Sequence, residues 1–476
     1  MRTLAKDIPQ AARDRPGEQV EVSGWVHRIR DMGGITFVVL RDRSGMVQIV
    51  FSEAPLLKSG GTSCGASGEK PSREEENGLT LESVITVSGI PAVNEKAPGG
   101  AELHAASLTV ISRAMPELPY QVNGDIAKTG LETILDNRLL SVRNPRIRAI
   151  FKVQAVIIEA FSAYLRSRDF TEIKTSKLVW GGTEGGTELF TVEYFDRKVC
   201  LAQSPQFYKE AMVAGGMERV FEVAPAYRAE KHDTPRHLNE YVSLDLEMGF
   251  IESEKDLIEL ERGLLTHIFE EVARKNAADL ALWNASVPDA AAVAKAPVIA
   301  YDDAVKTANE WAGKAAGQAA GQGAGKTGGT AGRKAEGSSA RIFDINPEAE
   351  RFLCDWAFAE YGTDLVFINE FPRRYRPFYT YPSDANRTMS FDALFRGLEI
   401  TTGGRRQHSY EAFVETLPRF GLKLENMQNY AALLRYGCPP HGGFAIGCER
   451  LTARILGLAN VKEASLFPRD RKRVAP

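Results

Sequence analysis

Two segments far apart in the chain concentrate residue types that bind phosphate groups. The first, residues 226–240, reads Ala-Tyr-Arg-Ala-Glu-Lys-His-Asp-Thr-Pro-Arg-His-Leu-Asn-Glu and contains Arg228 and Arg236. An arginine withdrawn from water loses several kcal/mol of hydration unless it is paired. These arginines therefore either meet carboxylates within the fold or bind a polyanionic ligand. An ion-paired surface hairpin explains the segment equally well on its own.

The second segment, residues 441–450, reads His-Gly-Gly-Phe-Ala-Ile-Gly-Cys-Glu-Arg and leads into helix-forming residues at 451–458. Glycines allow the backbone to approach a ligand closely, and the start of a helix favours negative charge. Arg450 would lie in the opening turn of that helix. Taken with the first segment, it favours a site for a phosphate-rich ligand.

Together the two segments resemble motifs 2 and 3 of the class II aminoacyl-tRNA synthetases. Residues 227–230 match the pattern Phe/Tyr-Arg-x-Glu, and residues 442–450 match Gly-Gly-x-x-x-Gly-x-Glu-Arg. Each pattern is weak by itself, but their order and wide separation are specific. The resemblance is to the aspartyl branch in its archaeal-like form, and it runs from about residue 19 to residue 476.

The resemblance implies a reaction in which the amino-acid carboxylate attacks the α-phosphorus of ATP and pyrophosphate leaves. The substrate is itself the nucleophile, so the protein needs cationic clamps and no catalytic base. On the family pattern, Arg228 and Arg450 are the catalytic residues, acting on the α-phosphate and the γ-phosphate. Mg²⁺ is the expected cofactor, held by oxygen atoms of Glu399 and Thr402, and ATP is a substrate. The ATP-binding residues implied in this way are Arg228, Glu230, Arg236, His237, Glu399, Gly447 and Arg450.

The amino acid can be inferred from charge, because an acidic side chain sheltered from water needs a cation beside it. Lys209 and Arg406 match the residues that read the aspartate side chain in the family, and Asp245 matches the acceptor of the substrate ammonium. An asparaginyl-tRNA synthetase would not place a lysine against a neutral amide, although Lys209 taken alone would be an exposed helical lysine. The set implied for L-aspartate is Glu184 on a closing loop, Ser204, Gln206, Lys209, Asp245 and Arg406.

The first hundred-odd residues predict the strands of a small β-barrel. Apolar and polar residues alternate over 20–26, 35–40, 46–51 and 84–90, with glycine turns between some of them. A five-stranded OB-fold barrel is the natural candidate. The resemblance implies that a class II catalytic domain follows, with an antiparallel sheet flanked by helices, so the expected fold class is α+β.

The barrel is expected to bind the tRNA anticodon, since unstacked bases suit aromatic platforms and polar edge contacts. Phe37 and Gln48 match stacking and base-edge residues of the family, although Phe37 could equally lie in the barrel core. His27 resembles versions that accept both tRNA(Asp) and tRNA(Asn), whereas Lys96 resembles those that accept tRNA(Asp) alone. The expected partner is tRNA(Asp), with tRNA(Asn) left open as a second acceptor.

Composition sets the expected domain boundaries. Residues 1–115 are predicted to form the barrel domain, 116–144 a hinge and 145–476 the catalytic domain. Small and polar residues dominate about 58–78 and about 312–340, and both segments are predicted to be insertions. The first is expected to be flexible. The second is expected to be a passive surface loop without chemistry, with nonspecific RNA contact through its lysines as the alternative.

A homodimer is also implied by the resemblance. Residues 171–179 resemble motif 1, which makes the dimer interface in the family. Ser176 stands where the family usually has a proline, and the loss of a fixed φ should change the local kink without abolishing the interface.

Composition excludes several other classes of protein. The formal net charge of -3 argues against a generally basic nucleic-acid coat, so RNA contacts must come from local patches. The five cysteines contain no Cys-x-x-Cys pair, which argues against a disulfide framework and a structural zinc site. No apolar run approaches a membrane span, so a cytoplasmic protein without membrane contact is expected. The alternative of a synthetase-like RNA-binding protein without catalysis should have lost Arg228, Glu399 or Arg450.

Overall fold

The computed structural model describes residues 2–52, 79–182, 189–322 and 342–475. This part of the chain divides into two compact units, Met1–Asn144 and Pro145–Pro476. The insertion predicted at 58–78 lies outside the described residues.

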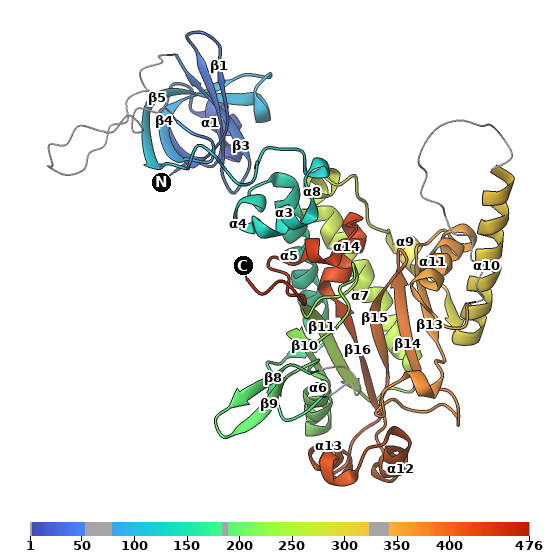
Figure 1. The fold of residues 1–476 in the computed structure, drawn as a ribbon. Helices are drawn as coiled ribbons and strands as arrows, with labels where there is room; N and C mark the ends of the chain where they lie inside the picture. The colour runs from blue at the N-terminus through green and yellow to red at the C-terminus, as the bar shows by residue number, and fades with distance from the viewer. Residues whose placement is uncertain (1, 53–78, 183–188, 323–341, 476) are drawn as a thin grey trace. The chain divides into compact units, whose positions relative to one another are not determined.

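The first unit is built around a closed barrel of five strands in the order β1-β2-β3-β5-β4 (Figure 1). The strands are β1 (Val20–Asp31), β2 (Thr36–Arg41), β3 (Met46–Phe51), β4 (Val84–Val93) and β5 (Ala101–Ser112). Alternate residues such as Val38 and Leu40 point into the core, where Ile8 of the helix α1 (Ile8–Asp14) joins them. The predicted OB-fold barrel is therefore confirmed.

Residues 116–144 belong to the first unit and contain two short helices, α3 (Leu131–Asp136) and α4 (Arg138–Ser141). Asn144 Nδ2 donates to Val122 O at 2.8 Å, which fastens the end of this segment to its start. Its role as a hinge stays a prediction.

The second unit is organised by an eight-stranded sheet in the order β12-β13-β14-β15-β16-β11-β10-β6. Its strands are β6 (Thr171–Glu172), β10 (Arg219–Tyr227), β11 (Glu240–Gly249), β12 (Val298–Ala300), β13 (Leu365–Asn369), β14 (Ser390–Phe395), β15 (Leu398–Arg405) and β16 (His441–Gly447). The pairs from β13 through to β10 are antiparallel, and only the two edge strands β12 and β6 pair in parallel. With the barrel before it, this sheet confirms the predicted α+β class.

Helices pack along the large sheet (Figure 1). The long helices α5 (Pro145–Arg166) and α7 (Glu254–Lys275) and the shorter α14 (Cys448–Leu456) share one apolar core with the sheet. The other helices are α6 (Gln206–Met212), α8 (Ala277–Ala281), α9 (Ala290–Ala294), α10 (Tyr301–Gln322), α11 (Pro347–Tyr361), α12 (Tyr410–Thr416) and α13 (Gln428–Arg435). A small second sheet has the order β7-β9-β8, with β7 (Leu178–Val179), β8 (Thr191–Tyr194) and β9 (Arg197–Leu201).

The segment predicted as the second insertion overlaps the end of a helix. Helix α10 continues to Gln322, so the predicted segment at 312–340 starts as helix. Its beginning is rich in alanine, the residue with the highest helix propensity, and this outweighs the interspersed glycines. Residues 323–341 lie outside the described part. Among the helices described, none is both long and apolar enough to cross a membrane.

Candidate active site

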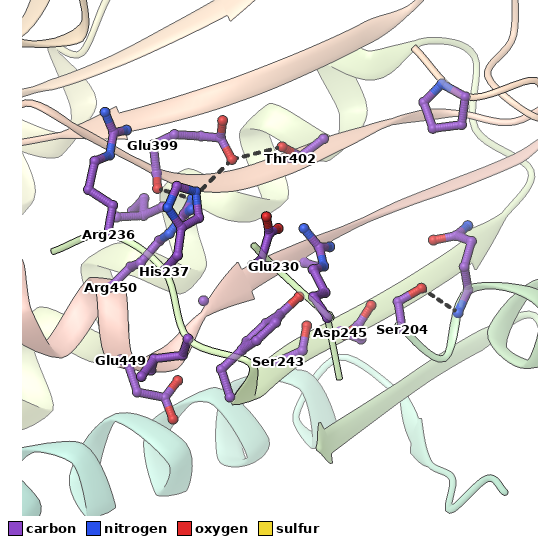
Figure 2. Close-up of a pocket in the computed structure, with 18 of the residues that line it drawn as sticks. Ser204, Glu230, Arg236, His237, Ser243, Asp245, Glu399, Thr402, Glu449 and Arg450 are labelled. Carbon is purple, nitrogen blue, oxygen red and sulfur yellow. Dashed lines mark hydrogen bonds and ion pairs between the residues drawn. The ribbon is translucent and has the colours of Figure 1, made fainter. Parts of the chain in front are cut away.

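A pocket of about 320 Å³ opens beside strands β11, β15 and β16 of the large sheet (Figure 2). Strand alternation builds one wall, because Leu244 and Leu246 point into the core while Ser243 and Asp245 face the pocket. The predicted residues that line this pocket are Ser204, Gln206, Lys209, Arg228, Glu230, Arg236, His237, Asp245, Glu399, Thr402, Arg406, Gly447 and Arg450. Glu184 lies outside the described residues.

Two arginines at one end of the pocket are each paired with a carboxylate. Arg236 Nη2 donates to Glu350 Oε1 at 2.6 Å, and Arg450 Nη1 donates to Glu399 Oε1 at 3.2 Å. Glu350, which lies on α11 and is only 5 % exposed, was not predicted from the sequence. Its Oε2 also accepts the backbone N–H of Glu399 at 2.9 Å. The buried carboxylate of Glu350 therefore connects Arg236 to Glu399, whose side chain pairs with Arg450.

The remaining predicted phosphate-binding groups lie beside this pair. The guanidinium carbon of Arg228 lies 5.5 Å from the ring centre of Tyr241 on β11. Burial, together with the positive charge of Arg450, lowers the pKa of His237, which favours a neutral ring at pH 7. His237 Nδ1 lies 2.6 Å from Thr234 Oγ1, so the turn itself orients the imidazole.

Oxygen donors for a cation gather where β14 and β15 pair. Asp392 faces Thr402 across the two strands, and Thr402 Oγ1 donates to Glu399 Oε1 at 3.3 Å. Burial, and also the nearby Glu399 carboxylate, raise the pKa of Asp392 to about 7, although Arg376 opposes this with an ion pair at 2.8 Å. Asp392 was missed because only strand pairing reveals it.

These donors fit Mg²⁺, which prefers carboxylate and hydroxyl oxygens and completes its shell with water and phosphate. The described residues contain no group of three His, Cys, Asp or Glu side chains that could enclose a metal by themselves. A cation at Glu399 and Asp392 would therefore need ligands from the nucleotide.

The opposite, buried end of the pocket holds Lys209 and Arg406 around Glu247, which was not predicted. Lys209 Nζ donates to Asp245 Oδ1 at 3.0 Å and lies 3.4 Å from Glu247 Oε2, and Arg406 Nε donates to Glu247 Oε1 at 3.0 Å. Arg406 Nη2 also donates to Gly443 O at 3.0 Å, and a Cβ at Gly443 would collide with the Glu247 carboxylate. The alternative of an exposed lysine is wrong, because Lys209 is 1 % exposed.

The charges at this end balance before a ligand binds. Lys209 and Arg406 bring two positive charges, and Asp245 and Glu247 bring two negative charges. Asp245 Oδ2 is buried and has no hydrogen-bond partner in the described part of the chain. A ligand ammonium at this orphan oxygen would offset the charge of Asp245 and leave Lys209 and Arg406 with one positive charge more than Glu247 balances, so the site suits a ligand that carries both an ammonium and a carboxylate.

The four predicted anticodon residues lie in the barrel unit and differ in accessibility. Phe37 is half-buried on β2 and lies outside the barrel core, which removes the alternative of a core phenylalanine. Gln48 Nε2 donates to Glu102 Oε2 at 2.9 Å, and Lys96 is exposed. His27 is buried, with Nδ1 2.8 Å from Arg41 Nη1, and burial followed by the charge of Arg41 lowers its pKa.

Comparison with known proteins identifies both parts of the chain. Residues 130–471 match the family described as tRNA synthetases class II (D, K and N). The chain belongs to this family. Residues 20–111 match the OB-fold nucleic acid binding domain. The class II resemblance drawn from the two phosphate-binding segments is thereby confirmed.

Relatives of this class II synthetase cover its whole length. It is 41% identical to the aspartate–tRNA(Asp/Asn) ligase of Thermus thermophilus, with 100% of both chains covered. It is 37% identical to the aspartate–tRNA(Asp) ligase of Pyrococcus horikoshii, with 97% of each chain covered.

Solved structures share the fold over the same extent. Asparaginyl-tRNA synthetase from Pyrococcus horikoshii, complexed with asparaginyl-adenylate, matches with a TM-score of 0.80 at 28% identity and covers 100% of both chains. Aspartyl-tRNA synthetase from Entamoeba histolytica matches with a TM-score of 0.78 at 27% identity, covering 100% of this chain and 93% of its own.

Proposed function

We propose that this synthetase joins L-aspartate to ATP as aspartyl-adenylate and then transfers the aspartyl group to tRNA(Asp). The observation that carries the proposal is the orphan Oδ2 of Asp245 beside Lys209, Arg406 and Glu247: a substrate ammonium at Oδ2 offsets the charge of Asp245 and leaves two cations against the single carboxylate of Glu247. Aspartate has one more negative charge than asparagine, so this cluster favours the acid over the amide. The names of the relatives support the same substrate.

In the activation step, Asp245 Oδ2 accepts a hydrogen bond from the substrate ammonium, and Arg406 with the field of Lys209 holds the side-chain carboxylate. This leaves the α-carboxylate free to face the nucleotide. One of its oxygens forms a bond to the α-phosphorus of ATP while the bond from that phosphorus to the bridging oxygen of pyrophosphate breaks. No proton is transferred, so positioning and charge stabilisation are sufficient.

Arginines supply the charge stabilisation. Arg228 donates to the α-phosphate, where negative charge develops in the transition state, and Arg236, His237 and Arg450 hold the outer phosphates. Glu350 and Glu399 keep Arg236 and Arg450 ordered until ATP arrives. The phosphates then replace part of this carboxylate pairing, which limits the entropy lost on binding.

A bound Mg²⁺ would be held by Glu399 and Thr402, with Asp392 as an additional oxygen donor, and it would neutralise charge on the outer phosphates. The position of these side chains in the pairing of β14 with β15 supports this assignment.

The barrel is proposed to bind the anticodon through Phe37, Gln48, His27 and Lys96. A half-buried aromatic ring outside the barrel core suits base stacking, which supports the role of Phe37. His27 is buried beside Arg41, so its proposed part is to support the neighbouring surface and not to touch a base. tRNA(Asn) is a second candidate acceptor, because relatives named for both tRNAs and relatives named for tRNA(Asp) alone cover this chain. Charging purified tRNA(Asp) and tRNA(Asn) side by side separates the two specificities.

A cytoplasmic homodimer is the proposed working form. Leu178 and Trp180, in and beside the segment that resembles motif 1, are 45 % and 76 % exposed, so this segment offers apolar surface that a partner subunit could cover. Sedimentation at micromolar concentration should show a dimer, and a monomer with full activity would count against this assembly.

The decisive experiment is aspartate-dependent exchange of labelled pyrophosphate into ATP. L-aspartate should support exchange and L-asparagine should not. Exchange with asparagine alone would overturn the proposal in favour of an asparaginyl enzyme. Absence of exchange with both amino acids would favour a synthetase-like protein without catalysis.

A further inference from the structure

A chain of hydrogen bonds runs behind the amino-acid end of the pocket and ends on Arg406. His441 Nε2 lies 3.2 Å from Glu210 Oε2, Gln206 Nε2 donates to Glu210 Oε1 at 2.8 Å, and Arg406 Nη2 lies 3.4 Å from Gln206 Oε1. His441, Glu210, Gln206 and Arg406 are respectively 0 %, 2 %, 4 % and 6 % exposed. Solvent therefore has little access to the hydrogen bonds between them.

The protonation of the first two members follows from their neighbours. His441 Nδ1 lies 2.9 Å from Pro439 O, so both ring nitrogens face acceptors and both must donate. Burial alone would lower the pKa of His441, but the hydrogen bonds to Cys438 and Glu210 raise it to about 10. Burial opposes ionisation of Glu210, yet His441 and other hydrogen-bonding neighbours lower its pKa. Glu210 is thus an ionised group that only accepts.

An ionised Glu210 decides which way the amide of Gln206 points. The two ends of an amide have nearly the same shape, so packing cannot distinguish them and hydrogen bonding must do so. Glu210 only accepts and Arg406 only donates. The NH₂ group of Gln206 must therefore face Glu210, and its oxygen must face Arg406.

The orientation of Gln206 bears on the guanidinium that faces the substrate. Nε and Nη2 of Arg406 are engaged with Glu247, Gly443 and Gln206. Within the described part of the chain, Nη1 makes no hydrogen bond, and Arg406 lines the pocket. Nη1 is therefore the donor available to a substrate carboxylate. A reversed Gln206 would present NH₂ to Nη2 and push the guanidinium from this position.

We propose that His441 and Glu210 are positioning residues that fix the amide of Gln206 and, through it, hold Arg406 in register for the aspartate side chain. This inference rests on the proposed function. It assigns part of the amino-acid selectivity to two side chains that do not touch the substrate.

The test is Glu210→Gln, which keeps the shape of the side chain but allows either end of the new amide to face Gln206. The KM for aspartate in pyrophosphate exchange should rise about tenfold, because one charge-assisted hydrogen bond no longer sets the orientation. The KM for ATP should stay within about twofold, since Glu210 does not line the nucleotide end. His441→Gln should shift the KM for aspartate in the same direction, because Glu210 then loses its counter-charge and can take up a proton.

Tyr430→Phe is the matched control. Tyr430 Oη donates to Glu210 Oε2 at 2.6 Å, so this variant also removes a buried hydrogen bond from Glu210 but leaves its contact with Gln206. Its KM for aspartate should change by less than about threefold. An equal rise in Tyr430→Phe and Glu210→Gln would show a general loss of packing and overturn the proposal.

A second measurement tests whether Glu210 acts through Gln206. In a Gln206→Met background there is no amide to orient, so adding Glu210→Gln should leave the KM for aspartate almost unchanged. Additive effects of the two substitutions would contradict the inference. If the unmodified protein shows no aspartate-dependent exchange, the proposed function itself fails. Normal exchange in that protein, with an unchanged KM in Glu210→Gln, refutes only the positioning role.

Discussion

Replacing Lys209 by methionine tests the charge balance on which amino-acid selection depends. Lys209 Nζ is already engaged by Asp245, the backbone oxygen of Leu246 and Glu247, so its contribution to the substrate is expected to come through its field. With the substrate ammonium against Asp245, the cluster of Lys209, Arg406, Asp245 and Glu247 has an excess of one positive charge, and Lys209→Met removes it. The substituted cluster with the ammonium bound should then be neutral and should no longer favour an acid over an amide.

The magnitude follows from Coulomb's law. For a substrate carboxylate about 6 Å from Nζ and an effective dielectric constant of about 20, the interaction is about 2.8 kcal/mol. That corresponds to about a 100-fold change in the ratio of kcat/KM for aspartate to kcat/KM for asparagine. The lysine is almost fully buried, so solvent screening reduces this value less than it would at the surface.

The assay compares pyrophosphate exchange with aspartate and with asparagine in the same preparation. Loss of a buried lysine also destabilises the fold, but the ratio of the two substrates is independent of the fraction folded. Lys177→Met is the control, because Lys177 Nζ donates to Glu222 Oε1 at 2.9 Å away from the pocket. A ratio that stays constant in Lys209→Met would refute the charge-balance argument.

Three further changes test other parts of the molecule. Arg450→Ala should lower pyrophosphate exchange about 100-fold or more while the melting temperature changes little, since its side chain is 26% exposed; retained exchange would remove Arg450 from the mechanism. Phe37→Ala should raise the KM for tRNA about tenfold and leave pyrophosphate exchange intact, and an equal loss in both assays would indicate a folding defect. Burial raises the pKa of Glu261 from 4.5 to about 8. Between pH 4.5 and pH 8 the folded state therefore keeps a proton on Glu261 that the unfolded state has lost. The free energy of unfolding should consequently fall by about 3 kcal/mol from pH 5.5 to pH 8. Glu261→Gln should flatten that slope in urea unfolding, and an unchanged slope would assign it to other groups.

The fold was predictable where local patterns suffice. Alternation of apolar residues over 20–26 and 46–51 predicted strands that the barrel contains. The helical start of the segment predicted as the second insertion was missed. Glycine and alanine were read there as one linker composition, although the alanines carry α10 on to Gln322.

The site was predictable residue by residue and not as a set of contacts. The family resemblance led to Arg236, Arg450 and Glu399, but nothing in either motif points to Glu350. Glu350 lies more than a hundred residues after Arg236 and meets it only when α11 packs beside β15. Asp392 was missed for a similar reason. Its relation to Thr402 exists only in the register between β14 and β15.

The sequence left two interpretations of Arg228 and Arg236 open, namely ion pairs inside the fold or contacts with a polyanionic ligand. For Arg236 the structure shows that the two are compatible. Arg236 is paired with Glu350 and still lines the pocket. A buried guanidinium without any partner would destabilise the protein whenever ATP is absent. A guanidinium with a fully enclosed partner could not bind phosphate. Pairing with Glu350 at the pocket wall avoids both the loss of stability and the loss of phosphate binding. The same carboxylate also fixes the backbone of Glu399, where the nucleotide and its cation are expected to bind.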